Sequence, residues 1–156
     1  MDKQDKLIDE LIKLLRGGMA HASLTDALAN LSTDLRGKKP GHLPYSIWQL
    51  VEHIRIAQWD MLEFSRDANH QSPKWPDEYW PEEPEPENDE AWENSVNQIN
   101  KDLEEFIKLL KTGDLHEPFE HGDGQTLMRE ALQIADHNSY HTAEIIVVRR
   151  LLGAWK

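Results

Sequence analysis

The stretch of the chain best suited to chemistry is Asp136–His141, which carries two histidines four residues apart. That spacing places His137 and His141 on one face of a helix, where their imidazoles can share a metal ion. The flanking apolar residues recur at the helical period, with Asn138 and His141 inside the stripe and His137 at its edge. Polar side chains in such a stripe are unfavourable unless each has a partner. The pattern therefore predicts a polar site inside the protein.

A third imidazole is offered by His53, in the middle of a second amphipathic segment, where it borders an apolar face. If the two helices are neighbours, His53, His137 and His141 form a three-nitrogen site with positions open to water or substrate. This ligand count is typical of catalytic rather than structural metal centres. The residue pattern leaves one alternative open, in which the three are core-edge histidines bonded to carboxylates or to the backbone.

Two further residues are candidates for roles near this site. His21 follows the Gly17-Gly18 turn and is a possible catalytic or substrate-binding group, although a solvated or helix-capping histidine has the same signature. Asn138 could hold a water or orient a ligand, and a satisfied core amide would look the same.

Three acidic residues lie beside the apolar faces that carry the histidines. Glu52, Asp136 and Glu144 could accept hydrogen bonds from the free ring nitrogens, which metal-bound histidines usually require. Salt bridges to arginines compete for the same carboxylates. The aromatic Trp80 is a candidate for the rim of the pocket.

Helical periodicity supplies the elements that would position these residues. Ser46 with Gln49, and Ser23 with Asp26, are typical helix starts, and Gly113 is a typical helix end. We expect a short helix carrying Leu24, Leu28 and Leu31, and one domain over residues 1–156 that is all-α and built as a four-helix bundle. The four long helices are expected at 3–16, 46–64, 89–111 and 126–152.

The segment Ser72–Asp89, between the second and third long helices, has five prolines, several acids and the aromatics Trp75, Tyr79 and Trp80. Prolines exclude a regular helix, and a disordered linker has no use for large aromatics. We expect a long, ordered crossover that packs its aromatics onto the bundle, with some of them at the rim of a pocket.

Composition excludes several classes of function. The 156 residues include no cysteine, so the chain has no disulfide, thiolate metal site or cysteine nucleophile, and a cytoplasmic setting is expected. No apolar run is long enough to span a membrane. The formal net charge of -12 disfavours nucleic acid as a partner. The basic cluster Arg36–Lys39 is interpreted as a solvated loop.

Several motifs resemble the DinB-like family of metal-binding four-helix bundles. Pro44–Ile54 (PYSIWQLVEHI) resembles its second-helix segment, and His137–Ile145 (HNSYHTAEI) resembles its last-helix histidine pair. Arg16–Ala22 and Tyr79–Pro81 are similar to the branch called DinB-like 2. The resemblance covers nearly the whole chain.

The resemblance implies a divalent metal held by His53, His137 and His141, in a bundle that often forms homodimers. Zn, Ni and Fe all suit three imidazoles. It further implies a metal-dependent enzyme acting on a small molecule, either a thiol S-transferase that uses a low-molecular-weight thiol or a hydrolase. The alternatives are a non-catalytic metal-binding or stress-response module, and a scaffold in which the histidines pair with acids.

Overall fold

The computed structural model describes residues 3–155 and confirms the predicted all-α class. Five α-helices and two 3-10 turns occur within this range, and it holds no strand. The short α2 and the turns η1 and η2 belong to the connecting segments. In chain order the elements are α1 (Lys3–Arg16), α2 (Leu24–Leu28), η1 (Thr33–Leu35), α3 (Ile47–Arg66), η2 (Asp77–Tyr79), α4 (Asp89–Thr112) and α5 (Leu127–Leu151).

The helices begin and end where the capping residues predict, to within about two residues. The Ser46 hydroxyl accepts from the Gln49 amide at 3.1 Å, and the Gln49 side chain accepts from the Ser46 amide at 3.2 Å. Ser23 and Asp26 form the same reciprocal box at the start of α2. This pairing satisfies backbone donors that the first helical turn leaves free. One expectation was wrong, because α2 ends at Leu28 and does not reach Leu31.

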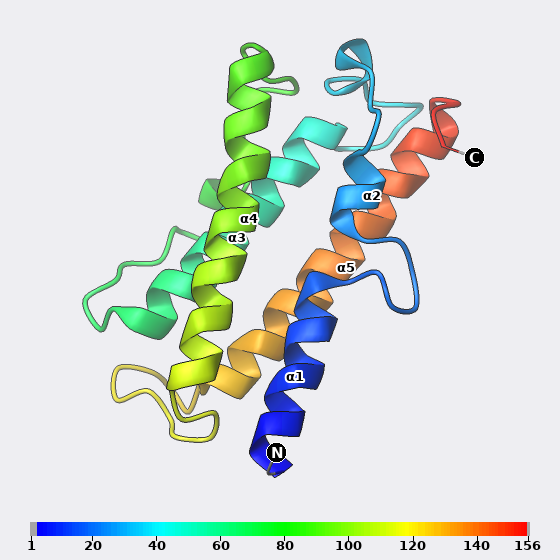
Figure 1. Cartoon of the computed structure of the whole chain (residues 1–156). Coiled ribbons are helices and arrows are strands. Elements are labelled where there is room, and N and C mark those ends of the chain that lie inside the picture. Colours follow the sequence, from blue (N-terminus) through cyan, green and yellow to red (C-terminus); the bar gives the residue numbers. More distant parts are fainter. Residues whose placement is uncertain (1–2, 156) are drawn as a thin grey trace.

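Helix α5 contacts each of the other four α-helices, and α4 packs mainly on α3. Helices α1 and α2 follow one another along the same side of α5, as Figure 1 shows. The two shorter helices therefore cover a length of α5 that a single long helix would otherwise cover.

The interior consists of two apolar clusters. One contains Leu62, Phe106 and Ile134, and the other contains Val51, Trp92 and Ile145. Full burial of such a side chain contributes about 1.5–3 kcal/mol, so these clusters supply most of the drive to fold. Along α3, α4 and α5, the residues between the two clusters include several buried polar groups: Gln58, Asp102, His141 and Thr142. The buried His53 lies on α3 beside residues of the second cluster.

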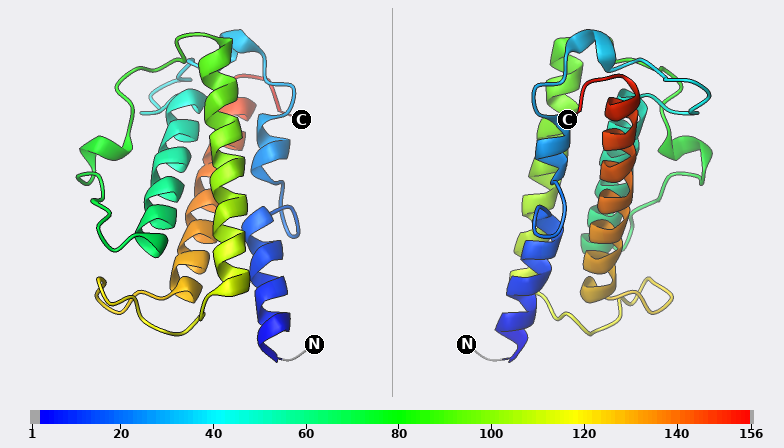
Figure 2. Two further views of the ribbon diagram at one scale, coloured as in Figure 1. Left: turned by 60° about the vertical axis from the view of Figure 1, so that its left-hand side comes forward. Right: turned by 90° about the vertical axis from the view of Figure 1, so that its right-hand side faces the viewer.

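The crossover between α3 and α4 runs along the outer side of α3 (Figure 2). Its carbonyl groups accept hydrogen bonds from α3: Ser46 donates to Pro84, and Gln49 Nε2 donates to Pro81 at 3.1 Å. The aromatics behave differently from one another. Tyr79 is buried and Trp80 half-buried, but Trp75 is 72% exposed, so the expectation that all three pack inward was wrong for Trp75.

Arg36 also departs from the sequence-based expectation. The residue is buried rather than solvated, and its Nη1 bonds to Asp89 Oδ1 at 2.7 Å. Its guanidinium lies 4.5 Å from the centre of the Trp92 ring. The acid and the aromatic that attract it are more than fifty positions away in the chain, which local sequence patterns do not reveal.

Candidate metal centre

Three histidines from two helices converge between α3 and α5. One nitrogen of each ring lies within 4.8 Å of the other two, and His53 Nε2 is 3.0 Å from His137 Nε2. His53 and His141 are buried and His137 is half-buried. The expected neighbourhood of the three imidazoles is therefore present.

The spacing of these nitrogens and their chemistry suit a metal ion. Nitrogens about 2.0–2.1 Å from one zinc lie roughly 2.9–3.4 Å apart at bond angles near 90–110°, which includes the His53–His137 separation. Imidazole is a ligand common to zinc, nickel, iron and copper. The three histidines could thus hold a divalent cation.

Two of the rings have their tautomer fixed by an outer partner. His53 Nδ1 lies 2.9 Å from the carbonyl oxygen of Tyr79, which can only accept, so this nitrogen carries the proton. His141 Nδ1 donates in the same way to Glu144 Oε2 at 2.7 Å. Both Nε2 atoms keep a free lone pair. Outer partners of this kind usually orient metal-bound histidines.

All three imidazoles are held in the neutral form. Burial, together with the neighbouring His141 and His53, lowers the pKa of His137 to about 4, against the opposing influence of the Asn138 side chain. Burial and His53 lower the pKa of His141 to about 4 as well. Burial also lowers the pKa of His53, against the hydrogen bond to Tyr79. Neutral imidazole is the form that binds metal.

The crossover covers one side of the site with Trp80. Its ring stacks on His53 with centroids 3.7 Å apart and planes 6° from parallel, and it meets the edge of His141 at 5.8 Å. Tyr45 stacks on Trp80 in turn, at 3.9 Å. Trp80 therefore lies at the site, and His53 is only 1% exposed beneath this cover.

The three acidic candidates have different surroundings. Glu144 bonds to His141, as described above. Glu52 instead forms a two-point salt bridge with Arg55, each contact at 2.8 Å, which is the competing arrangement that the sequence left open. Asp136 is exposed and lines a cavity on another side of α5.

That cavity, of about 450 Å³, is enclosed by α1, α2, α4 and α5, and it contains His21. The Ser139 hydroxyl donates to His21 Nε2 at 3.1 Å, because His21 Nδ1 already donates to the Ala22 carbonyl. Within residues 3–155, His21 has no hydrogen bond or ring contact with the three clustered histidines. The structure thus places the candidate catalytic residue His21 in this cavity and apart from them.

Asn138 and Gln58 connect this cavity to the histidine site. Asn138 Nδ2 donates to Gln58 Oε1 at 2.8 Å, and Gln58 Nε2 donates to the Ile99 carbonyl at 2.7 Å. Gln58 is fully buried and was not identified from the sequence. Its signal was available, because Gln58 interrupts an apolar helix face just as Asn138 does.

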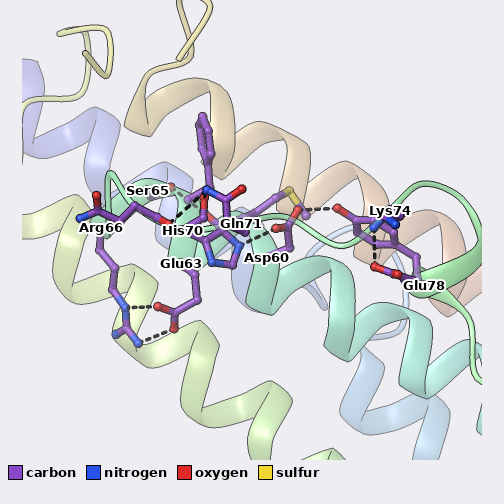
Figure 3. Close-up of polar contacts among 12 residues, drawn as sticks. Asp60, Glu63, Ser65, Arg66, His70, Gln71, Lys74 and Glu78 are labelled. Atoms are coloured by element: carbon purple, nitrogen blue, oxygen red, sulfur yellow. Dashed lines mark hydrogen bonds and ion pairs between the residues drawn. The ribbon is translucent and has the colours of Figure 1, made fainter. Parts of the chain in front are cut away.

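Another histidine, half-buried and also missed from the sequence, lies nearby. His70 Nε2 donates to Asp60 Oδ1 at 2.7 Å, and the Tyr79 hydroxyl donates to the other oxygen of Asp60 at 2.6 Å. Figure 3 shows His70 and Asp60 pointing toward one another. Asp60 accepts from the Tyr79 hydroxyl, and the backbone carbonyl of the same tyrosine accepts from His53. This network therefore holds the crossover in place at the candidate site.

The family model for the DinB superfamily matches residues 19–145, a range that includes all three clustered histidines. No curated protein and no solved structure matches the chain. Within the described residues, no helix has both the length and the apolar character needed to cross a membrane.

Proposed function

The chain belongs to the DinB superfamily, and on that premise we propose that it is a divalent-metal-binding enzyme acting on a small molecule. His53, His137 and His141 are the proposed metal ligands. We further propose that the fold is a four-helix bundle in which α1 and α2 together occupy one of the four positions.

The observation that carries this proposal is the composition of the ligand set. Within the part of the chain that the structure describes, the cluster contains three histidines and no fourth histidine or carboxylate. Glu144, the nearest carboxylate partner, bonds to the outer nitrogen of His141. Structural zinc sites use four protein ligands, whereas catalytic sites use three and leave a position for water or substrate.

Three neutral nitrogen ligands leave a bound cation its full positive charge, which acidifies a bound water or thiol and polarises a carbonyl. This chemistry supports thiol S-transfer, with a low-molecular-weight thiol as one substrate, or hydrolysis. The protein itself orients the rings, through Tyr79 for His53 and through Glu144 for His141, and shields them with Trp80. Zinc, nickel and iron all remain candidates for the ion.

One observation favours the alternative of a non-catalytic metal-binding module. Trp80 stacks directly on His53, and His137 is the only one of the three rings that is not buried. A substrate must therefore approach along His137 or displace part of the crossover. A metal that is bound but unreachable would serve binding or stability instead of catalysis.

Metal analysis of untagged protein tests the metal site, and activity assays then separate the two alternatives. We expect about one equivalent of zinc or nickel after reconstitution, and under roughly 0.1 equivalent in His141→Ala. Thiol-transfer and hydrolysis assays follow on both proteins. Activity that depends on His141 supports the enzyme, whereas any activity that persists in His141→Ala lies outside this site. Metal binding without activity supports the non-catalytic module.

A homodimer, which the family resemblance implies, also remains a proposal. Helix α5 exposes Tyr140, Val147 and Leu151 at 63%, 46% and 61%. These three side chains share one side of the helix at the helical period, and they suit a contact with a second copy. Light scattering on Val147→Lys and wild type tests it, since a dimer that uses this face would dissociate in the variant.

A further inference from the structure

Two of the buried polar atoms without a hydrogen-bond partner belong to neighbouring residues at the candidate metal centre. They are His137 Nδ1 and Asn138 Oδ1. The Asn138 side chain interacts with the His137 ring, yet neither atom has a hydrogen bond in the structure. Buried polar atoms are nearly always paired, so two adjacent exceptions at a functional site require an explanation.

The orientation of the Asn138 amide follows from its neighbours. The Ile99 carbonyl can only accept a hydrogen bond, so Gln58 must present its NH₂ group to it and its oxygen to Asn138. Asn138 must then present its own NH₂ group to Gln58. The remaining atom of the Asn138 amide is the oxygen Oδ1, an acceptor without a donor.

The position of the proton on His137 follows in the same way. His53 Nδ1 uses its proton on the Tyr79 carbonyl, so His53 Nε2 is an acceptor. In the metal-free protein, His137 Nε2 therefore carries the proton and donates it across the 3.0 Å contact. His137 Nδ1 is then a bare acceptor next to the Asn138 oxygen, which is another acceptor. Two acceptors cannot pair, which explains why both atoms lack partners.

We propose that metal binding moves the proton of His137 from Nε2 to Nδ1, and that Asn138 Oδ1, oriented by Gln58, accepts the resulting hydrogen bond. This inference rests on the proposed metal site. His137 carries one proton before and after, and the metal takes the place of the proton on Nε2. Asn138 and Gln58 are positioning residues that act through His137.

The rearrangement gives each of the three rings the same design. His53 donates from Nδ1 to Tyr79, His141 from Nδ1 to Glu144, and His137 from Nδ1 to Asn138. All three Nε2 atoms are then available as ligands. Metal binding also supplies a partner to the two unpaired atoms, so part of the binding free energy comes from a hydrogen bond that the metal-free protein lacks.

Imidazole ¹⁵N NMR spectra report directly which ring nitrogen is protonated. We expect His137 to carry its proton on Nε2 after EDTA treatment and on Nδ1 after loading with Zn²⁺. Protonation at Nε2 in the zinc-loaded protein would overturn the proposal, because zinc would then bind through Nδ1. The same spectra should show His53 and His141 protonated at Nδ1 in both states.

Zinc titrations of variants test the positioning roles. Asn138→Leu removes the acceptor and should weaken zinc binding about 10- to 100-fold, as loss of an outer partner usually does. Asn138→Asp keeps an acceptor for His137 but loses the NH₂ group that donates to Gln58, so it should weaken zinc binding less than Asn138→Leu does. Ser139→Ala, on the same turn of α5 but directed at His21, is the matched control and should leave affinity unchanged.

Each outcome of the titrations bears on the proposal. If wild type binds no metal, the proposed function fails and this inference falls with it. If wild type binds zinc and Asn138→Leu binds it equally well, the metal site stands and the role of Asn138 is refuted. Thermal unfolding of each variant verifies folding. Should Asn138→Leu not fold, Gln58→Met takes its place, and it should also weaken binding because Asn138 loses its orientation.

Discussion

Two polar clusters that contain histidine lie beside the crossover, and they are built in opposite ways. At the first, His70 donates to Asp60, whose other oxygen accepts from the Tyr79 hydroxyl. At the second, His53, His137 and His141 point their Nε2 sides toward one another, and the carboxylate of Glu144 bonds only the outer nitrogen of His141.

The difference shows how a structural histidine can be told from a ligand. His70 and the Tyr79 hydroxyl each bond to one oxygen of the Asp60 carboxylate, so the polar groups of this cluster are paired with one another. At the other cluster, His53 and His141 have their outer nitrogens engaged, and the inner nitrogens of all three imidazoles face one another, an arrangement of ring nitrogens that suits a cation. The direction of the lone pairs, more than burial, separates the two clusters.

The largest expected difference is between two variants, each of which lacks one imidazole ring from one of the two clusters. His141→Ala should abolish stoichiometric zinc binding, because two imidazoles and solvent hold zinc far more weakly than three imidazoles do. His70→Ala should bind about one equivalent, like wild type, while unfolding at a lower temperature. Metal analysis and thermal unfolding of both proteins measure this. Equal loss of zinc in the two variants would contradict the assignment of roles.

Acid should destabilise the metal-free protein through the three-histidine cluster. The pKa values of His137 and His141 lie near 4 in the folded protein and near 6.5 when unfolded. Their contribution to stability is therefore complete above pH 6.5 and is lost as the pH falls toward 4, since the unfolded chain takes up protons first.

Urea denaturation of EDTA-treated protein between pH 7.5 and 4.5 measures this loss. A His137→Gln/His141→Gln variant is the control, because it lacks these two imidazoles and keeps the other titrating side chains. Its midpoint should fall less steeply than that of wild type. Parallel curves for the two proteins would show that the histidines do not govern the acid response.

Breaking the first cluster should cost stability without affecting metal stoichiometry. Asp60→Leu leaves both donors, His70 Nε2 and the Tyr79 hydroxyl, without their acceptor, which costs about 1–3 kcal/mol for a buried group. Glu63→Gln, one turn away and paired with Arg66 at the surface, should cost under about 1 kcal/mol. Chemical denaturation compares the two. A larger loss in Glu63→Gln would refute the bracing role of Asp60.

The smallest expected effect is at the outer partner of His141. Glu144→Gln keeps a hydrogen-bond acceptor but loses the negative charge, and it should weaken zinc binding about 10-fold. Asp136→Asn removes an exposed charge from the same helix and should change affinity less. Competition titrations with a chelating dye measure both. The role assigned to Glu144 would be untenable if the two substitutions had the same effect.

Much of the fold was predictable because its signals are local. Ser23 and Ser46 start helices, and Gly113 ends one, through contacts within a single turn. The meeting of the histidines was predictable because His53 and the Asp136–His141 stretch each interrupt an apolar stripe, and apolar stripes face a common core.

The partners of those histidines were beyond local patterns. The Tyr79 carbonyl reaches His53 only because of the path that the crossover takes, and Asp60 meets residues from two separate parts of it. Gln58 and Asn138 are eighty positions apart, and each alone resembles any other polar residue on a helix. Backbone acceptors and long-range amide pairs leave no periodic trace in a sequence.

The stacking of Trp80 on His53 gives the protein an intrinsic optical reporter. An indole in contact with a coordinating imidazole lies within the range over which paramagnetic ions such as Cu²⁺ and Ni²⁺ quench fluorescence, whereas Zn²⁺ quenches far less. Trp75, exposed on the same segment, lies farther from His53, at a ring separation of 6.5 Å. The chain has six tryptophans, so the part of the emission that Trp80→Phe removes should distinguish a site filled with an open-shell ion from one filled with zinc.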